Sequence, residues 1–300
     1  MPEWDAEVAI DEELVRALLT EQFPSIDASS ARLLGEGWDN AVWLVEESWA
    51  FRFPRRQIAI PGVERELAVL PRLAPLLPVP IPEPRFVGTP SERFPWPFFG
   101  AAVLPGRELA DADLAQDARV EMGAELGRLL SILHAPETLA RIDPERALPL
   151  DFNRRADMAF RVPRTRERLA ELEWPETAEI AELLAEAEAL PASSGNVLVH
   201  GDLHLRHVLV EGASMSGVID WGDVCVGDPA IDLQLVWSLL PAARRESFFA
   251  EYGPVERETS LRAQVLAVYL CAMLALYARS VGRASLERES LAGLERAFDE

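Results

Sequence analysis

The chain has 300 residues, of which 49% are hydrophobic and 26% charged, a balance typical of a folded protein and not of a disordered one. Its formal net charge of −21 argues against a nucleic-acid-binding protein, because such a surface repels phosphate backbones. The two cysteines, Cys225 and Cys271, are too few and too far apart in the sequence for a disulfide framework or a cysteine-based zinc cluster.

The first third of the chain predicts one helix followed by a small antiparallel sheet. The acidic start, with Glu3 and Asp5, lacks the basic segment of a secretory signal, so a cytoplasmic protein is expected. Asp11 can cap an amphipathic helix over 11–23. Short apolar runs separated by glycine, proline and charged residues predict strands over 31–35, 41–45, 49–53, 85–88 and 98–104. A second helix is expected between the third and fourth strands, over 63–77.

The remainder of the chain is predicted to be mainly helical. Apolar residues at a helical period predict helices over 111–134, 152–168, 177–190, 230–240, 242–252, 261–281 and 286–298. Short strands are expected among them over 196–199, 208–210 and 216–219. The apolar stretch 265–276 is too short to cross a bilayer, so no membrane partner is expected. The pattern predicts an α+β fold with a β-rich lobe over 1–104, a hinge at 104–106 and a helical lobe over 105–300.

Two acidic residues lie in polar segments next to apolar runs that are predicted to be strands. Asp202 lies in the segment His-Gly-Asp-Leu-His-Leu-Arg-His over 200–207, and Asp220 ends the run Val-Ile-Asp. A phosphoryl-transfer site needs a carboxylate that orients and deprotonates the attacking hydroxyl, and others that hold a metal ion against the phosphates. The two segments therefore predict that kind of chemistry.

The loop resembles the catalytic loop of the aminoglycoside phosphotransferase family, which is similar in fold to protein kinases. The family pattern is His-Gly-Asp, four residues, Asn, and then a strand that ends in Ile-Asp. The resemblance implies that Asp202 is the catalytic aspartate and Asp220 a metal ligand. His207 stands at the Asn position, as in macrolide phosphotransferases, which implies a second metal contact. Since Mg²⁺ prefers oxygen ligands, we expect His207 to act through water or through a hydrogen bond.

Other positions of the loop and of the following helix carry the resemblance further. His204 stands where protein kinases have a phosphate-contacting lysine. Asp228 and Asp232 match a Gly-Asp-Pro-x-x-Asp-Leu stretch, in which we expect them to cap the helix and brace the loop.

The N-terminal part adds the expected nucleotide-binding residues. The turn 35–40 can cover phosphates with backbone N–H groups, notably around Gly37. Arg52 stands where kinases have the lysine that grips the phosphates, and the chain contains no lysine at all. The resemblance implies an ion pair between Arg52 and Glu66, whereas Glu64 is expected to face solvent. It also implies that Ala102 and Leu104 offer backbone groups to the purine.

The resemblance implies an enzyme with a protein-kinase-like two-lobed fold that uses Mg²⁺ and transfers the γ-phosphate of ATP or GTP to a hydroxyl. The expected acceptor is antibiotic-like, a macrolide or an aminoglycoside. An acidic surface attracts cationic acceptors, although it also simply keeps proteins soluble. Two interpretations stay open for a set of polar residues in this part of the chain: they line a polar wall of the acceptor pocket, or they lie on an exposed helix face. They are Asp151, Asn153, Asp157 and Arg161.

Three alternatives stay open at this point. The first is a metabolic kinase that acts on a sugar, an amino alcohol or an amino acid. The second is a nucleotide-binding protein with weak activity, because the usual lysine and asparagine are missing. The third is a zinc hydrolase, since three histidines and one aspartate lie within eight residues, namely His200, Asp202, His204 and His207.

Overall fold

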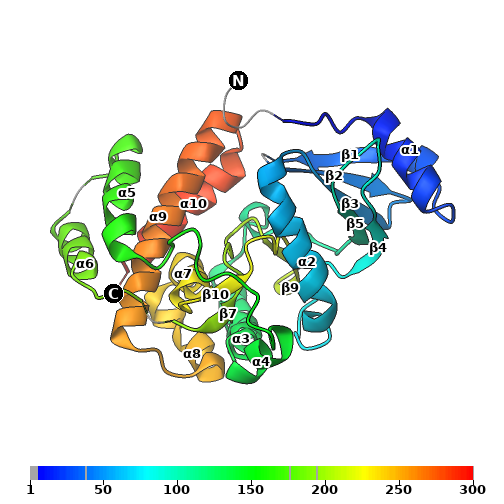
Figure 1. Ribbon diagram of the computed structural model, residues 1–300. Helices are drawn as coiled ribbons and strands as arrows, with labels where there is room; N and C mark the ends of the chain where they lie inside the picture. The colour runs from blue at the N-terminus through cyan, green and yellow to red at the C-terminus, as the bar shows by residue number, and fades with distance from the viewer. Residues whose placement is uncertain (1–5, 38, 176, 194, 300) are drawn as a thin grey trace. The chain divides into compact units, whose positions relative to one another are not determined.

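The computed structural model describes residues 6–37, 39–175, 177–193 and 195–299, so that the acidic start of the chain and Trp38 of the expected phosphate-covering turn lie outside it (Figure 1). These residues form two units. The first comprises Met1–Pro75, Pro80–Leu104 and Trp221–Asp223, and the second comprises Leu76–Val79, Pro105–Asp220 and Val224–Glu300. An antiparallel sheet dominates the first unit and helices the second, which confirms the predicted α+β class.

The first unit is built around a five-stranded sheet of order β1-β2-β3-β5-β4, in which all neighbours are antiparallel. Its elements are α1 (Glu12–Gln22), β1 (Arg32–Glu36), β2 (Asn40–Val45), β3 (Trp49–Pro54), α2 (Ile60–Leu73), β4 (Pro84–Gly88) and β5 (Phe98–Ala102). The predicted strands are confirmed to within two residues. The predicted start of α2 was wrong by three residues, because Pro61 lies in the first turn, where a helix tolerates proline.

The sheet has two faces, and the alternation of side chains along β3 separates their roles. Phe51 and Phe53 point to the face that α1 covers, where they pack in one cluster with Leu18 and Leu19. Successive residues of a strand point to opposite faces, so Arg52 lies on the other face. On that face the apolar residues of α2, Val63 and Leu67, pack against Phe99 and Ala101 of β5. Arg52 is thereby placed on the side of the sheet that α2 covers.

The second unit contains the remaining helices and two small sheets. Its elements are β6 (Arg107–Glu108), α3 (Gln116–Leu133), α4 (Pro136–Ile142), α5 (Met158–Glu171), α6 (Ala178–Glu188), β7 (Val197–Val199), β8 (Val208–Glu211), β9 (Ser214–Val218), β10 (Cys225–Gly227), α7 (Ala230–Leu239), α8 (Glu246–Tyr252), α9 (Arg257–Val281) and α10 (Ala284–Ala297). Short 3₁₀ turns occur at Ala28–Ser30, Gln57–Ala59, Leu109–Asp111 and Ala242–Arg244.

Several predictions for the second unit were wrong in detail. Helix α3 begins at residue 116 and not at 111, because a 3₁₀ turn over Leu109–Asp111 is followed by an irregular connection over 112–115. Helix α5 begins at residue 158 and not at 152, since Asp157 caps it by accepting a hydrogen bond from the Phe160 N–H. Strand β7 pairs with β10, which was not among the predicted strands. Strands β6 and β10 have two and three residues, and their sequences show no alternation that would have predicted them.

Helix α9 forms the centre of the helical packing. Figure 1 shows α10 running beside α9, and α7 and α5 also pack against it. Within the described part of the chain, α9 alone is long and apolar enough to cross a membrane. However, 67% of its most apolar stretch is buried inside the protein, as in the core helix of a soluble fold.

Candidate active site

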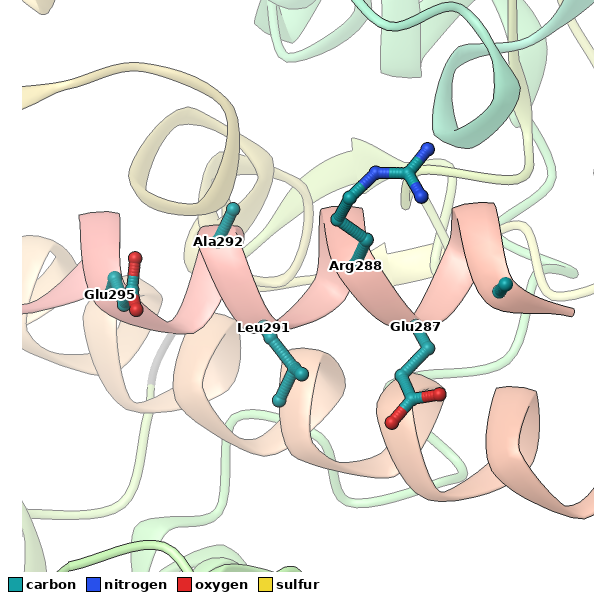
Figure 2. A pocket seen from close by; sticks show the side chains of 6 residues that line it. Glu287, Arg288, Leu291, Ala292 and Glu295 are labelled. Atoms are coloured by element: carbon teal, nitrogen blue, oxygen red, sulfur yellow. The ribbon is translucent and has the colours of Figure 1, made fainter.

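A surface pocket lies along α10, apart from the acidic residues of the predicted site. It is lined by one helix face, namely Ala284, Glu287, Arg288, Leu291, Ala292 and Glu295. In Figure 2, Arg288 points away from Glu287 and Leu291, so these side chains do not converge on a common point. The pocket therefore offers no arrangement for catalysis, and the chemistry must be sought in the loop that follows β7.

A buried carboxylate fixes the start of that loop. The two oxygens of Asp232 in α7 accept hydrogen bonds from the backbone N–H groups of His200, at 2.7 Å, and Gly201, at 3.1 Å. His134 contacts the same carboxylate through Nε2 at 3.2 Å. Gly201 has φ +88°, a conformation that glycine adopts without strain. Asp232 thus braces the loop, as the sequence predicts.

His200 ties the two acidic segments together. Its Nδ1 accepts a hydrogen bond from the Asp202 N–H at 3.1 Å, so the proton of the neutral ring sits on Nε2, which donates to the Ile219 carbonyl at 3.0 Å. The ring is fully buried, and burial lowers its pKa, which favours the neutral form. With both nitrogens engaged, His200 is not available as a metal ligand.

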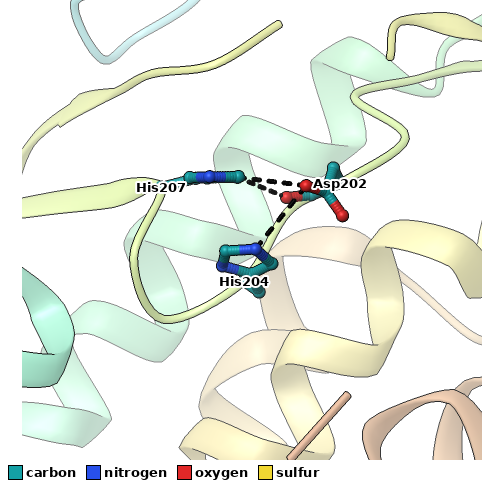
Figure 3. A group of neighbouring side chains, drawn as sticks. All are labelled: Asp202, His204 and His207. Carbon is teal, nitrogen blue, oxygen red and sulfur yellow. Dashed lines mark hydrogen bonds and ion pairs between the residues drawn. The ribbon is translucent and has the colours of Figure 1, made fainter. Parts of the chain in front are cut away.

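Asp202 is surrounded by basic side chains. Its Oδ2 lies 3.6 Å from His204 Nε2 and 3.7 Å from His207 Nδ1 (Figure 3). Its Oδ1 lies 3.7 Å from Arg155 Nη2. Burial would raise the pKa of this carboxyl group, but His204, His207 and Arg155 together hold it well below its usual value. Because its side chain is 31% exposed, an ionised Asp202 can meet a substrate from solvent.

Backbone hydrogen bonds set the tautomers of the two histidines beside Asp202. His207 Nδ1 donates to the Asp202 carbonyl at 2.7 Å, which leaves the Nε2 lone pair open in the neutral ring. His204 Nδ1 accepts from the Arg206 N–H at 3.2 Å, so its Nε2 carries the proton and points it at Asp202. The two rings stack with centroids 3.8 Å apart.

These tautomers argue against the zinc-hydrolase alternative. Asp202, His204 and His207 do have potential ligand atoms within 4.8 Å of one another. A zinc cluster nevertheless needs unprotonated ring nitrogens that point at one ion. His204 Nε2 carries a proton, and the nearer nitrogen of His207 is occupied by a backbone carbonyl. The cluster is better suited to orient Asp202 than to hold zinc.

Asp220 stands beside the open nitrogen of His207. Its Oδ2 lies 3.4 Å from His207 Nε2, and its backbone has φ +64°, an uncommon left-handed conformation for a residue other than glycine. Burial lowers the pKa of His207, which favours the neutral ring with a lone pair on Nε2. A lone pair and a carboxylate that face the same space are a suitable pair of acceptors for a hydrated cation.

In the first unit, the predicted ion pair is present. Arg52 Nε lies 3.3 Å from Glu66 Oε2, and the Glu66 side chain is only 1% exposed. The other oxygen of Glu66 accepts a hydrogen bond from the Trp221 N–H at 3.1 Å. Trp221 follows Asp220 directly in the chain, so α2 holds the segment next to the expected metal ligand. Glu64 is exposed, as predicted.

The remaining nucleotide-binding candidates lie at the ends of strands. Gly37 follows β1, and its N–H donates to the Asn40 carbonyl at 2.8 Å, which closes the turn before β2. Ala102 is the last residue of β5 and is exposed, whereas Leu104 is half-buried at the end of the first unit. Their roles toward a nucleotide stay predictions.

Sequence reasoning missed Arg155. Its guanidinium approaches the catalytic carboxylate candidate, yet nothing in the sequence distinguishes it from Arg154, which instead pairs with Asp157 at 2.5 Å. Only the tertiary fold, which returns the segment before α5 to the catalytic loop, makes this contact visible. Of the expected polar wall, Asp157 is a helix cap, and Arg161 is buried.

The fold is similar to those of solved antibiotic-modifying enzymes. The GDP complex of wild-type aminoglycoside 2'-phosphotransferase-IIIa matches with a TM-score of 0.68 at 23% identity, over 96% of this chain and 98% of that one. Macrolide 2'-phosphotransferase MphH from Brachybacterium faecium matches with a TM-score of 0.62 at 23% identity, over 95% of this chain and 98% of that one. At this identity the likeness shows the fold alone, and it confirms the kinase-like expectation.

Sequence relatives with a named activity cover only parts of the chain. A homoserine kinase from Pseudomonas aeruginosa is 34% identical over 151 residues, which are 47% of this chain and 45% of that protein. Viomycin phosphotransferase from Streptomyces vinaceus is 40% identical over 88 residues, which are 26% of this chain and 30% of that protein. The chain therefore spans less than half the length of the curated relatives that it matches.

A family model decides the assignment. The model of the phosphotransferase enzyme family matches residues 30–264, a stretch that contains Arg52, Glu66, the loop 200–207 and Asp220. The match covers far more than half of the chain. Two other observations agree with it: the fold is similar to that of a solved phosphotransferase, and the lowered pKa of Asp202 keeps an ionised aspartate in the loop. The chain belongs to the phosphotransferase enzyme family, whose members transfer phosphate to hydroxyl acceptors.

Proposed function

We propose that this protein is a small-molecule kinase that transfers the γ-phosphoryl group of ATP or GTP to a hydroxyl group, with Asp202 as its catalytic carboxylate. The observation that carries the proposal is the setting of Asp202. Its backbone is anchored through His200, and its ionised carboxylate is surrounded by His204, His207 and Arg155 while 31% of its side chain stays exposed.

The chemical step needs orientation more than a strong base. The hydroxyl oxygen forms a bond to the γ-phosphorus while the bond from that phosphorus to the β,γ-bridging oxygen breaks, and the electron pair leaves with the nucleoside diphosphate. Asp202 accepts the hydroxyl proton as a hydrogen bond and finally takes it up. A lowered pKa makes Asp202 a weak base, which suffices because the transition state is loose and the proton leaves late.

Mg²⁺ fits the acidic side of this site. Asp220 supplies an oxygen ligand of the type that Mg²⁺ prefers. His207 Nε2, 3.4 Å from Asp220 Oδ2, has an open lone pair that can accept a hydrogen bond from a water molecule of the ion. Bound there, the ion would neutralise charge on the phosphates of the nucleotide.

The nucleotide-binding residues that we propose are those that the family resemblance indicates, and each unit is considered by itself. In the first unit, Arg52, held by Glu66, would contact the phosphates; the backbone near Gly37 would cover them, and Ala102 and Leu104 would offer backbone groups to the purine. In the second unit, His204 stands beside Asp202, and its Nε2–H would donate a hydrogen bond to the phosphates or to Asp202. The GDP complex of the similar aminoglycoside 2'-phosphotransferase supports a nucleoside triphosphate as the donor.

The acceptor is proposed to be a small molecule, and neither a nucleic acid nor a membrane is an expected partner. The neighbours named above include aminoglycoside and macrolide phosphotransferases, which supports an antibiotic-like acceptor and a role in resistance. The homoserine kinase relative supports a metabolic acceptor. A cytoplasmic location is proposed, where both nucleotides are available.

The proposed function is tested by a transfer assay with purified protein. Labelled ATP and GTP are offered with Mg²⁺ and with macrolides, aminoglycosides, sugars and hydroxy amino acids, and the label is followed into the acceptor. The control is Asp202→Asn, which keeps the shape of the side chain and removes its charge. We expect transfer by the wild-type protein and a loss of about 10²- to 10⁴-fold in the variant. Stoichiometric tightly bound zinc together with no Mg²⁺-dependent nucleotide binding would contradict the proposal.

A further inference from the structure

Arg161 in α5 is a buried cation without a counter-charge in contact. Four arginine side chains of the described residues are at least nine-tenths buried, and three of them, Arg119, Arg262 and Arg296, donate to a backbone carbonyl and also meet a carboxylate. Arg161 is 6% exposed and makes neither contact within that part of the chain. Its guanidinium lies over the ring of Tyr269, 4.3 Å from the centroid. Burying an isolated charge costs free energy, so we expect Arg161 to meet an anionic group of a bound molecule.

A second orphaned polar atom belongs to the same region. Asp151 uses one oxygen, Oδ2, to accept a hydrogen bond from the Ala156 N–H at 2.8 Å, whereas its buried Oδ1 has no hydrogen-bond partner among the described residues. Electrostatic interaction couples it to Arg161: burial lowers the pKa of Arg161, and Tyr269 and Asp151 oppose that effect. Asp151 and Arg161 nevertheless form no ion pair within the stretches of chain that the structure describes.

The region adjoins the proposed catalytic carboxylate. Arg155, between Asp151 and Arg161 in the sequence, reaches to 3.7 Å from Asp202 Oδ1. The positive charge of Arg155 adds to the burial that lowers the pKa of Arg161. Arg155 therefore ties the segment that joins Asp151 to Arg161 to the carboxylate that is proposed to receive the acceptor hydroxyl.

We propose that the acceptor is a hydroxy amino acid, whose carboxylate binds Arg161, whose ammonium group binds Asp151 Oδ1, and whose side-chain hydroxyl reaches Asp202. The inference rests on the proposed kinase function and specifies its substrate class. A guanidinium matches a carboxylate with two parallel hydrogen bonds, and the ammonium group supplies the donor that the buried Asp151 oxygen lacks. An acceptor with several positive charges and no acid, such as an aminoglycoside, would leave Arg161 without a counter-charge.

The decisive variant is Arg161→Met, which keeps the length and the apolar body of the side chain but removes its charge. If Arg161 serves the acceptor and not the fold, the variant should be at least as thermally stable as the wild-type protein, because an uncompensated buried charge is removed. Its KM for the amino acid should rise about 10- to 100-fold, the loss expected for a charged hydrogen bond, while the KM for the nucleotide stays within about twofold. Arg164→Gln is the matched control, since Arg164 is exposed on the same helix and lies over the Phe160 ring.

The acceptors are offered in matched sets. Each of L-serine, L-threonine and L-homoserine is compared with its amino alcohol, in which the carboxylate is reduced, and with its hydroxy acid, in which the amino group is absent. The wild-type protein should prefer the amino acid over both analogues by at least about tenfold in kcat/KM. Arg161→Met should abolish the preference for the amino acid over the amino alcohol and keep the preference over the hydroxy acid. Asp151→Asn should abolish the preference for the amino acid over the hydroxy acid and keep the preference over the amino alcohol.

Each outcome decides the inference. The inference is supported if Arg161→Met loses only the preference over the amino alcohol and Asp151→Asn loses only the preference over the hydroxy acid. It is overturned if amino alcohols, aminoglycosides or macrolides are phosphorylated as well as the amino acids, or if Arg161→Met lowers the thermal midpoint and leaves the acceptor KM unchanged. Mg²⁺-dependent hydrolysis of ATP or GTP without phosphorylation of any amino acid overturns this inference and leaves the kinase function in place. The absence of both hydrolysis and Mg²⁺-dependent nucleotide binding removes the kinase function itself.

Discussion

Replacing Glu66 by glutamine tests whether the ion pair with Arg52 stabilises the first unit. The amide of glutamine can still accept the hydrogen bond from the Trp221 N–H, so the change removes mainly the negative charge. Glu66 is 1% exposed and Arg52 17%, which shields the pair from most of the solvent. The variant therefore isolates the electrostatic part of the contact.

The magnitude follows from the separation of the two charges. At 3.3 Å and an effective dielectric constant of about 20, two opposite unit charges attract each other by about 5 kcal/mol. Removing one partner of a buried pair typically costs about 3–5 kcal/mol. Because Arg52 keeps some solvent contact and the variant no longer buries a carboxylate, we expect a loss of about 2–3 kcal/mol in the free energy of unfolding.

The assay is urea unfolding followed by circular dichroism, with Glu64→Gln as the control. Glu64 lies on the same helix and is exposed, so its replacement should change the free energy of unfolding by less than about 0.5 kcal/mol. Arg52→Gln and the double variant complete a cycle that separates the pair from the single side chains. A coupling energy below about 0.5 kcal/mol would refute the reasoning, and it would mean that the contact orients Arg52 without stabilising the fold.

Four further outcomes are expected. Asp202→Asn should lower kcat by about 10²- to 10⁴-fold while the nucleotide Kd, measured by calorimetry, stays nearly unchanged, and near-normal turnover would remove Asp202 from the mechanism. Asp220→Asn should weaken Mg²⁺-dependent nucleotide binding, whereas His207→Asn should retain measurable Mg²⁺-dependent transfer; complete loss of metal-dependent binding in the second variant would make His207 a direct ligand. Burial raises the pKa of the Cys271 thiol to about 12, so a thiol reagent at pH 8 should label it only after unfolding, and rapid labelling of the folded protein would contradict its burial.

Local patterns were sufficient for the elements and residues whose signals lie within a few neighbouring positions. The alternation along β3 placed Arg52 opposite Phe51 and Phe53, and the loop pattern singled out Asp202 and Asp220. The helix cap at Asp11 was also predictable, because an N-terminal cap is a local hydrogen bond to the Leu14 N–H. Such features depend on the period of the element and on residue type, and both are visible in the sequence.

The sequence by itself therefore determined the α+β class, the phosphotransferase family and the acidic residues of the candidate site. The tertiary structure decided the pairing of β7 with β10, the tautomers of His204 and His207, the approach of Arg155 to Asp202, and the isolation of Arg161. Each of these depends on groups that are distant in the sequence or on backbone hydrogen bonds that form only after folding. Arg161 resembles its neighbouring arginines in the sequence and differs from them only in what surrounds it, because burial and the presence of a counter-charge are properties of the folded chain.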